Sequence, residues 1–177
     1  MDRLVRALAI TVSDRASAGH YEDRSGPLLV SLLTSAGCQT DGPTVVPDGD
    51  AVELALRAAV ADGYDVVVTT GGTGIAPRDH TPEMTARVVE RQLPGISEAI
   101  RAAGRVAVPT AILGRGIAGA VGRTLVVNLP GSTGGVRDGM TVLAPILRHA
   151  VDQLAGADHP ASAIEYAPID PAAGDAS

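Results

Sequence analysis

The sequence lacks lysine, phenylalanine and tryptophan, and it contains only three tyrosines among 177 residues. Without lysine the chain has no amine nucleophile for a Schiff base or a covalent lysine-AMP adduct. It also cannot contain a P-loop, whose lysine contacts nucleotide phosphates. The scarcity of aromatic side chains disfavours proteins that bind single-stranded nucleic acid by stacking its bases. A net charge of -6 points the same way, so we expect no nucleic-acid partner.

Cysteine and histidine are also scarce. The single cysteine, Cys38, cannot form an intrachain disulfide or a cysteine-rich zinc site, so we expect a reducing, cytoplasmic compartment. The four histidines are scattered without an H-x-x-x-H pair, which argues against a transition-metal site. The apolar stretch at residues 7–12 is too short for a signal-peptide core or a membrane span, so we expect no membrane contact.

The aliphatic segments alternate between two periodicities. Short runs at residues 8–12, 65–70 and 124–128 each end at a polar or glycine-rich turn, as buried parallel strands do, and weaker strands are expected at 44–46 and 110–113. Helical spacing occupies residues 28–36, 52–60, 81–93, 95–103 and 136–154, the last with a kink at Pro145. This alternation predicts an α/β fold, a three-layer α/β/α sandwich with a mostly parallel central sheet of Rossmann-like topology.

The length fits one domain and a short tail. We assign residues 1–155 to the domain. Residues 156–177 contain four acids, no arginine, and many alanines and prolines, which predicts a disordered acidic tail.

Four turns follow predicted strands, and ligands of open α/β sheets bind where the strands end. The first turn contains Ser13 and Asp14, the second Asp48, the third spans residues 69–83, and the fourth spans residues 128–132. We therefore expect the candidate site at one edge of the sheet.

Two of these turns are rich in glycine. The backbone N–H groups of Gly71, Gly72, Thr73 and Gly74 could form an anion-binding nest, with the Thr70 and Thr73 hydroxyls as further donors. A tight turn without a ligand is the simpler interpretation of glycines alone. Arg78 and Asp79 follow at once, however, and a second such turn, formed by Pro130, Gly131 and Ser132, precedes another helix. The pair suits a ligand with phosphates at both ends.

The two acids near these turns have alternative interpretations. Asp48 or Asp50 could cap the helix that begins near Ala51, and Asp79 could favour the positive end of the helix that Thr81 opens. Carboxylates beside phosphate-binding amides are also good ligands for Mg²⁺. Three arginines could neutralise phosphate or simply be solvated, namely Arg15, Arg24 and Arg78.

Together these turns resemble the molybdopterin adenylyltransferase family, which comprises the Mog type of bacteria and the G domains of larger molybdenum-cofactor proteins. The likeness spans about residues 5–155 and is carried by residues 11–14, 22–26, 47–48, 69–83 and 128–132. The resemblance implies a Mog-like sandwich, a homotrimer, and an enzyme of molybdenum cofactor biosynthesis. In that Mg²⁺-dependent reaction, AMP is transferred from ATP to the terminal phosphate of molybdopterin and pyrophosphate is released. The adenylated product then passes to a molybdenum insertase.

The resemblance also implies roles for single residues. Asp48 is expected to be the magnesium-associated catalytic carboxylate and Asp79 a second catalytic acid, whereas His80 stands where the family would have an aliphatic residue. The expected substrate contacts are Ser13, Asp14, Thr70, Gly71, Gly72, Thr73, Gly74, Arg78, Thr81, Pro130, Gly131 and Ser132. The alternative is a non-catalytic molybdopterin-binding trimer that serves as carrier or scaffold. A pure binder needs no pair of acids, so Asp48 and Asp79 favour the enzyme.

Overall fold

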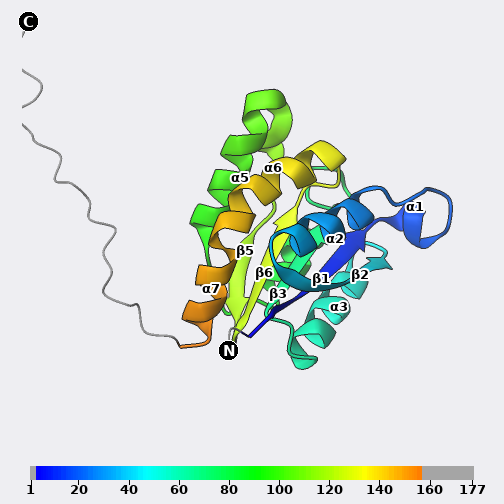
Figure 1. The fold of residues 1–177 in the computed structure, drawn as a ribbon. Coiled ribbons are helices and arrows are strands. Elements are labelled where there is room, and N and C mark those ends of the chain that lie inside the picture. Colours follow the sequence, from blue (N-terminus) through cyan, green and yellow to red (C-terminus); the bar gives the residue numbers. More distant parts are fainter. Residues whose placement is uncertain (1–2, 157–177) are drawn as a thin grey trace, which may run out of the picture.

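A six-stranded sheet forms the middle layer of the computed structural model, which describes residues 3–156 (Figure 1). Its strands run in the order β2-β1-β3-β6-β5-β4. The first four are parallel, and β5 and β4 are antiparallel additions at one edge. The strands are β1 (Val5–Val12), β2 (Cys38–Val46), β3 (Val66–Thr70), β4 (Arg91–Gln92), β5 (Ala118–Val121) and β6 (Thr124–Leu129). The predicted, mostly parallel sheet is confirmed.

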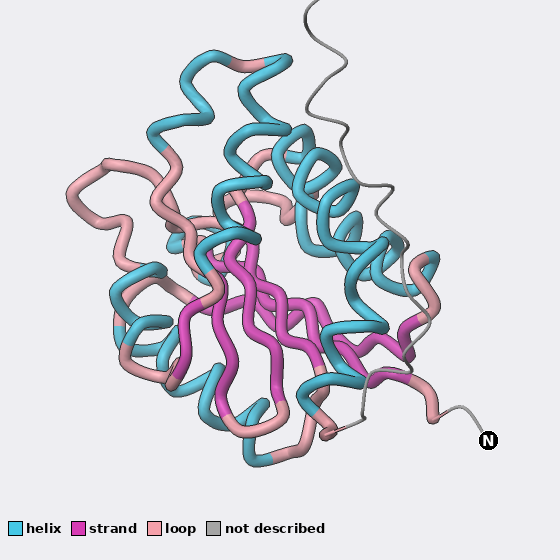
Figure 2. The backbone as a smooth tube through the Cα atoms, turned by 90° about the vertical axis from the view of Figure 1, so that its left-hand side faces the viewer, coloured by secondary structure: helices cyan, strands magenta, loops and turns pink. Residues whose placement is uncertain are grey.

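Helices cover both faces of this sheet, as the tube view shows (Figure 2). One face packs against α2 (Ser25–Ser35), α5 (Pro94–Ala107), α6 (Thr133–Leu143) and α7 (Leu147–Leu154). The other packs against α3 (Asp50–Ala61) and α4 (Thr81–Ala86). The remaining elements are α1 (Asp14–Ser17) and the 3-10 helices η1 (Pro109–Leu113) and η2 (Ala144–Ile146). The predicted α/β/α sandwich is therefore confirmed.

The central strands are apolar on both sides because each side is covered. Val66 and Val68 belong to the core on the α5/α6 face, whereas Val67 belongs to the core on the α3 face, and all three are fully buried. Burial of an aliphatic side chain of this size contributes about 1.5–3 kcal/mol, so a core without phenylalanine or tryptophan can still hold the sandwich together. No helix in the described part of the chain is both long and apolar enough to span a bilayer.

Strand register brings the predicted turns to one edge. Thr11 pairs with Thr70, and Thr70 pairs with Leu129, so β1, β3 and β6 end level with one another. Val12 pairs with Val46 at the end of β2. All four turns therefore leave the same edge of the sheet.

Several local predictions were wrong. Residues 110–113 form part of η1 rather than a strand, because Pro109 starts a 3-10 turn directly after α5. The helix expected at 81–93 ends at Ala86, and the chain then turns into the short strand β4. Thr81 is the first helical residue and His80 the N-cap, without a side-chain capping bond.

Other local predictions hold. The predicted strand at 44–46 is the end of the longer β2, and the predicted kink at Pro145 is η2, which separates α6 from α7. The tail predicted at 156–177 lies almost wholly outside the described residues and stays a prediction.

Candidate functional site

The two glycine turns touch one another at the carboxyl edge of the sheet. The Thr70 hydroxyl donates to the Pro130 carbonyl at 2.8 Å, and the Gly71 N–H donates to the Leu129 carbonyl at 3.2 Å. A Cβ on Gly131 would lie only 3.1 Å from the Gly71 Cα. The turns after β3 and β6 therefore form one continuous surface, and Thr70 and Gly71 help to build it from inside.

Asp48 connects three turns. Its carboxylate accepts hydrogen bonds from the backbone N–H groups of Gly49 (2.7 Å) and His80 (3.0 Å), and the Thr81 hydroxyl lies 3.5 Å from Oδ1. Its own backbone N–H donates to Asp14 Oδ1 at 3.0 Å. The unusual residue at position 80 thus contributes through its backbone, whereas its side chain is exposed.

Neither Asp48 nor Asp50 caps α3. The N-cap of α3 is Gly49, and no side chain caps that helix. Asp50 instead lies 3.6 Å from Arg87, as part of an exposed ion pair.

Position 72 requires glycine, because both its backbone conformation and its neighbours exclude a side chain. Its φ is +64°, in the region that favours glycine. A Cβ there would lie 2.2 Å from Thr81 Oγ1 and 2.3 Å from Asp48 Oδ2. The close approach of backbone and carboxylate therefore requires glycine.

Asp79 closes the loop that follows the glycine turn. Its Oδ2 accepts the Ala76 N–H at 3.1 Å, and the Asp79 N–H donates back to the Ala76 carbonyl at 2.9 Å. A Cβ on Gly74 would lie 2.7 Å from the same Oδ2, so the carboxylate is packed against the glycine turn.

Arg115, which sequence reasoning did not single out, clamps this loop. Its Nε donates to the Gly74 carbonyl at 2.7 Å and its Nη2 to the Asp79 carbonyl at 2.6 Å, while Nη1 pairs with Glu83. Its backbone N–H donates to the Thr73 carbonyl at 2.8 Å. The hydrogen bond from Arg115 holds the pKa of the Glu83 carboxyl below its ordinary value of 4.5.

A small polar cavity of about 150 Å³ lies on one side of the glycine turn. Three carboxylates, two arginines and a serine line it, together with Val12 and Gly72. Those six side chains are Asp14, Asp48, Asp79, Arg15, Arg78 and Ser13. Its charged and polar lining suits phosphate oxygens and a hydrated cation.

A larger, mainly apolar cavity of about 570 Å³ lies on the other side of the turn. Its volume falls in the range of small-molecule sites, about 300–1,000 Å³. Thr73, Gly74, Pro130, Gly131 and Ser132 form the end that adjoins the glycine turns. The other walls come from α5, η1 and α6.

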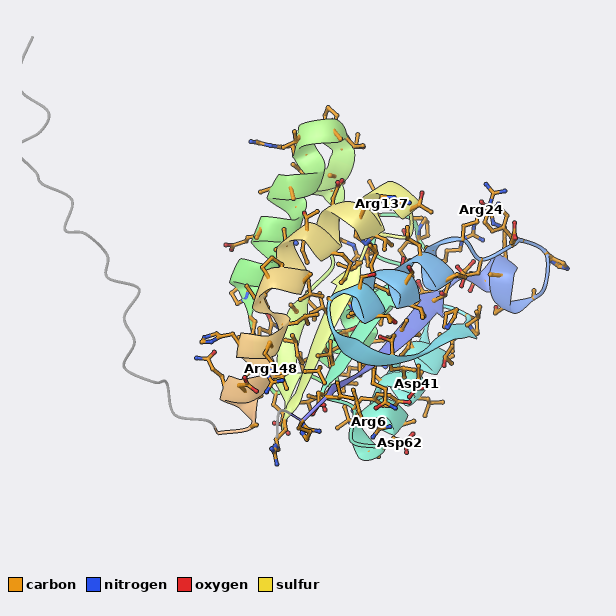
Figure 3. The ribbon with its side chains drawn as sticks, in the orientation of Figure 1. Arg6, Arg24, Asp41, Asp62, Arg137 and Arg148 are labelled. Carbon is orange, nitrogen blue, oxygen red and sulfur yellow. The ribbon has the colours of Figure 1, made fainter. Side chains whose placement is uncertain are left out.

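The structure thus divides the candidate residues between two neighbouring cavities. Ser13, Asp14, Asp48, Gly72, Arg78 and Asp79 line the polar one, and the five residues named above line the apolar one. Thr70, Gly71 and Thr81 line neither, and all three are buried. Arg24 also lies outside both cavities, where it is exposed beside Glu22 at 3.6 Å (Figure 3).

The polar cavity offers the donor set that Mg²⁺ uses. Within residues 3–156 no group of three or more His, Cys, Asp or Glu side chains is arranged to enclose a metal ion. Mg²⁺ does not need such a cage, because it takes one or two carboxylates and completes its shell with water and phosphate oxygens. Asp48 retains lone pairs beyond its two backbone bonds, and it shares the cavity with Asp14 and Asp79. The residues fit the ion.

Comparison with known proteins shows the family to which the chain belongs. Residues 8–149 match the family described as "Probable molybdopterin binding domain". The chain belongs to this molybdopterin-binding family. The molybdopterin adenylyltransferase of Helicobacter pylori strain J99 is 39% identical over 83% of this chain and 86% of its own length. The molybdenum cofactor biosynthesis bifunctional protein of Synechococcus elongatus is 42% identical over 88% of this chain.

The chain spans about half the length of such bifunctional relatives, 49% in that case. Among solved structures, the molybdopterin biosynthesis Mog protein from Mycobacterium ulcerans is 46% identical. It superposes with a TM-score of 0.83 and covers 88% of this chain and 99% of its own. A structure described as the anomalous substructure of MogA is 50% identical, with a TM-score of 0.82 over 84% of this chain and 99% of its own. The family's fold is therefore the fold of this chain.

Proposed function

We propose that this protein is a molybdopterin adenylyltransferase of molybdenum cofactor biosynthesis, which transfers AMP from ATP to the terminal phosphate of molybdopterin and releases pyrophosphate. One observation carries the proposal: a cavity lined by Asp14, Asp48 and Asp79 shares the glycine turn as a wall with an apolar cavity of ligand size. The first suits phosphates with a cation, and the second suits an organic ring system.

The reaction makes modest demands on the chain. A phosphate monoester is ionised at pH 7, so its oxygen can attack the α-phosphorus of ATP with little help from a general base. The site must instead align two anionic groups and compensate their charge. Arg15 and Arg78 line the polar cavity and can supply positive charge there. The absence of lysine is no obstacle, because the transfer is direct and needs no covalent enzyme-AMP intermediate.

The turns then have separate tasks. Ser132 caps α6 by accepting the Gly135 N–H at 3.0 Å, and the first residues of α6 line the apolar cavity at Gly134 and Gly135. Such a helix end favours a phosphate, here the terminal phosphate of molybdopterin. The ATP phosphates would occupy the polar cavity. Asp48 would hold Mg²⁺ there, and Asp79, which lines the same cavity, would contact the ion or the adenylyl group in transfer. When bound, Mg²⁺ supplies charge compensation for the phosphate oxygens.

The proposal extends to the cellular setting. We expect a homotrimer that hands its product to a molybdenum insertase. A cytoplasmic location agrees with a single cysteine, Cys38, which is buried as a free thiol.

Mass spectrometry of small molecules tests the activity. The purified protein is incubated with molybdopterin, ATP and Mg²⁺, and each component is omitted in turn. Adenylated molybdopterin should form only when all three are present. Tight binding of molybdopterin without adenylylation would refute the enzyme and leave the carrier or scaffold.

A further inference from the structure

The apolar cavity has a single carboxylate among its described lining residues, that of Asp138 on α6. Asp138 is half-buried and follows Ser132 by six residues, about 9 Å along the helix axis at the usual rise per residue. Its Oδ2 lies 3.9 Å from the point where a Cβ on Gly104 of α5 would be. The carboxylate therefore lies beside α5 at Gly104, at a distance at which a side-chain carbon would make only ordinary van der Waals contact with it.

This carboxylate is available for a ligand. Within residues 3–156 it has neither a hydrogen-bond donor nor an ion-pair partner, although other carboxylates near the site are engaged by backbone N–H groups or arginine. A half-buried charge beside apolar walls is unfavourable unless something pairs with it. The Asp138 carboxylate is thus a hydrogen-bond acceptor without a donor in the described chain.

Arg101 supplies a cation to the same cavity from α5. Its Nη1 donates to the Gly116 carbonyl at 3.1 Å, which holds the guanidinium in place. A guanidinium has five N–H donors, so this bond leaves others for a ligand. Among its described lining residues the cavity combines one carboxylate and one guanidinium with the aliphatic side chains of Ile100 and Leu113.

That combination selects among heterocycles. A pterin presents an amino group and a ring N–H side by side, and these two donors match the two oxygens of a carboxylate. The neighbouring ring carbonyl matches a guanidinium. Adenine presents an amino group beside a ring nitrogen that accepts, so a carboxylate would face one repulsive contact.

We propose that Asp138 is the specificity-determining residue that binds the amino and ring N–H groups of the pterin, with Arg101 donating to the adjacent carbonyl. The assignment rests on the proposed function. It gives a position to each end of molybdopterin, the terminal phosphate and the pterin ring. The phosphate lies at Ser132, and the pterin edge lies about 9 Å further along α6. Because Asp138 disfavours adenine in the apolar cavity, we expect ATP to bind in the polar cavity.

The test compares two fluorescent probes, 6-hydroxymethylpterin and 6-hydroxymethyllumazine, by equilibrium titration. Lumazine carries a carbonyl where the pterin carries its amino group, so the wild-type protein should bind the pterin more tightly. Asp138→Asn keeps the shape but loses the paired acceptor. It should weaken pterin binding about ten- to hundredfold and remove the preference over lumazine.

The controls separate folding from recognition. Glu98→Gln removes an exposed carboxylate of α5 that does not line the cavity, and it should leave both affinities unchanged. Binding of Mg²⁺-ATP to Asp138→Asn should match the wild type, because the polar cavity is intact.

Equal pterin affinity in Asp138→Asn and the wild type would overturn the proposal, as would wild-type protein that binds both probes equally or neither. A wild type that prefers the pterin through Asp138 but never adenylylates molybdopterin would refute the proposed function alone.

Discussion

The backbone N–H of Asp48 donates a 3.0 Å hydrogen bond to the Asp14 carboxylate, which joins turns that are 34 residues apart in the sequence. The Asp48 carboxylate in turn accepts from the His80 N–H, a further 32 residues along the chain. Asp14 therefore fixes the backbone from which the proposed magnesium ligand extends, and Asp48 fixes the loop that carries Asp79.

Substitution of Asp14 separates its hydrogen bond from its charge. Asp14→Asn keeps an oxygen that can accept the Asp48 N–H, whereas Asp14→Ala leaves that donor without its partner. Loss of such a bond costs about 1–3 kcal/mol, so Asp14→Ala should lower kcat/KM about tenfold or more and raise the Mg²⁺ concentration needed for half-maximal activity. Asp14→Asn should stay within about threefold of the wild type. Steady-state kinetics of the three proteins across a Mg²⁺ titration tests this prediction. An Asp14→Ala variant with wild-type kcat/KM would disprove that Asp14 positions Asp48.

Gly72→Ala should damage the site without abolishing the fold. The added Cβ would overlap Thr81 Oγ1 and Asp48 Oδ2, and a φ of +64° adds strain of about 1–3 kcal/mol. We expect a lower Tm and a loss of activity at least as large as that of Asp14→Ala. The matched control is Gly95→Ala in α5, where nothing lies within 4 Å of the new Cβ. It should equal or exceed the wild type in stability, and comparable losses in both variants would show that the crowding at Gly72 is unimportant.

Arg115 should act by holding the loop between Gly74 and Asp79. Arg115→Ala removes the bonds to both carbonyls and to Glu83, so amide hydrogen exchange across residues 75–79 should accelerate and kcat should fall. Arg115→Lys can replace one of these bonds and should recover part of both effects. If exchange in that loop is unchanged in Arg115→Ala, the clamp does not order it.

Much of the fold could be predicted, because the Val-rich strands at 65–70 and 124–128 and the helical spacing at 136–154 are long and regular. Strands β4 and β5 could not be predicted. Arg91–Gln92 is too short for a pattern, and Ala118–Val121 has only small side chains with one valine. Their pairing depends on neighbours in the sheet rather than on local preference.

The candidate site, like the fold, contains residues that the sequence predicts and residues that only the structure reveals. Asp48, Asp79 and the glycine turns stand at strand ends, where the sequence itself directs attention. Arg115 lies in a Gly-Arg-Gly segment without a motif, and its side-chain partners are 32 to 41 residues distant. Only the folded structure shows that Arg115 contacts this loop. Likewise, only the structure shows that Thr70 is buried, because its sequence position suggests a hydroxyl available to a ligand.

The Glu83 and Arg115 pair should make stability depend on acid pH. The pKa of Glu83 in the folded protein lies below its ordinary value of 4.5, so the stabilisation is complete above that value. It is lost as the pH falls through the lowered pKa. Glu83→Gln should therefore reduce Tm at pH 7 by about 2 °C, since half-exposed pairs contribute at most about 1 kcal/mol. The difference should shrink as the pH falls below 4.5, and a difference that stays the same from pH 7 to well below 4.5 would exclude the pair as its source.

The central claim is that the polar cavity carries out AMP transfer to molybdopterin, and single-turnover release of pyrophosphate from ATP tests it most directly. The wild-type protein with Mg²⁺ should release one pyrophosphate for each adenylated molybdopterin, and none without molybdopterin. Asp79→Asn should bind molybdopterin as the wild type does but release pyrophosphate at least about 100-fold more slowly. Release at the wild-type rate from Asp79→Asn, or none from the wild type itself, would contradict the account.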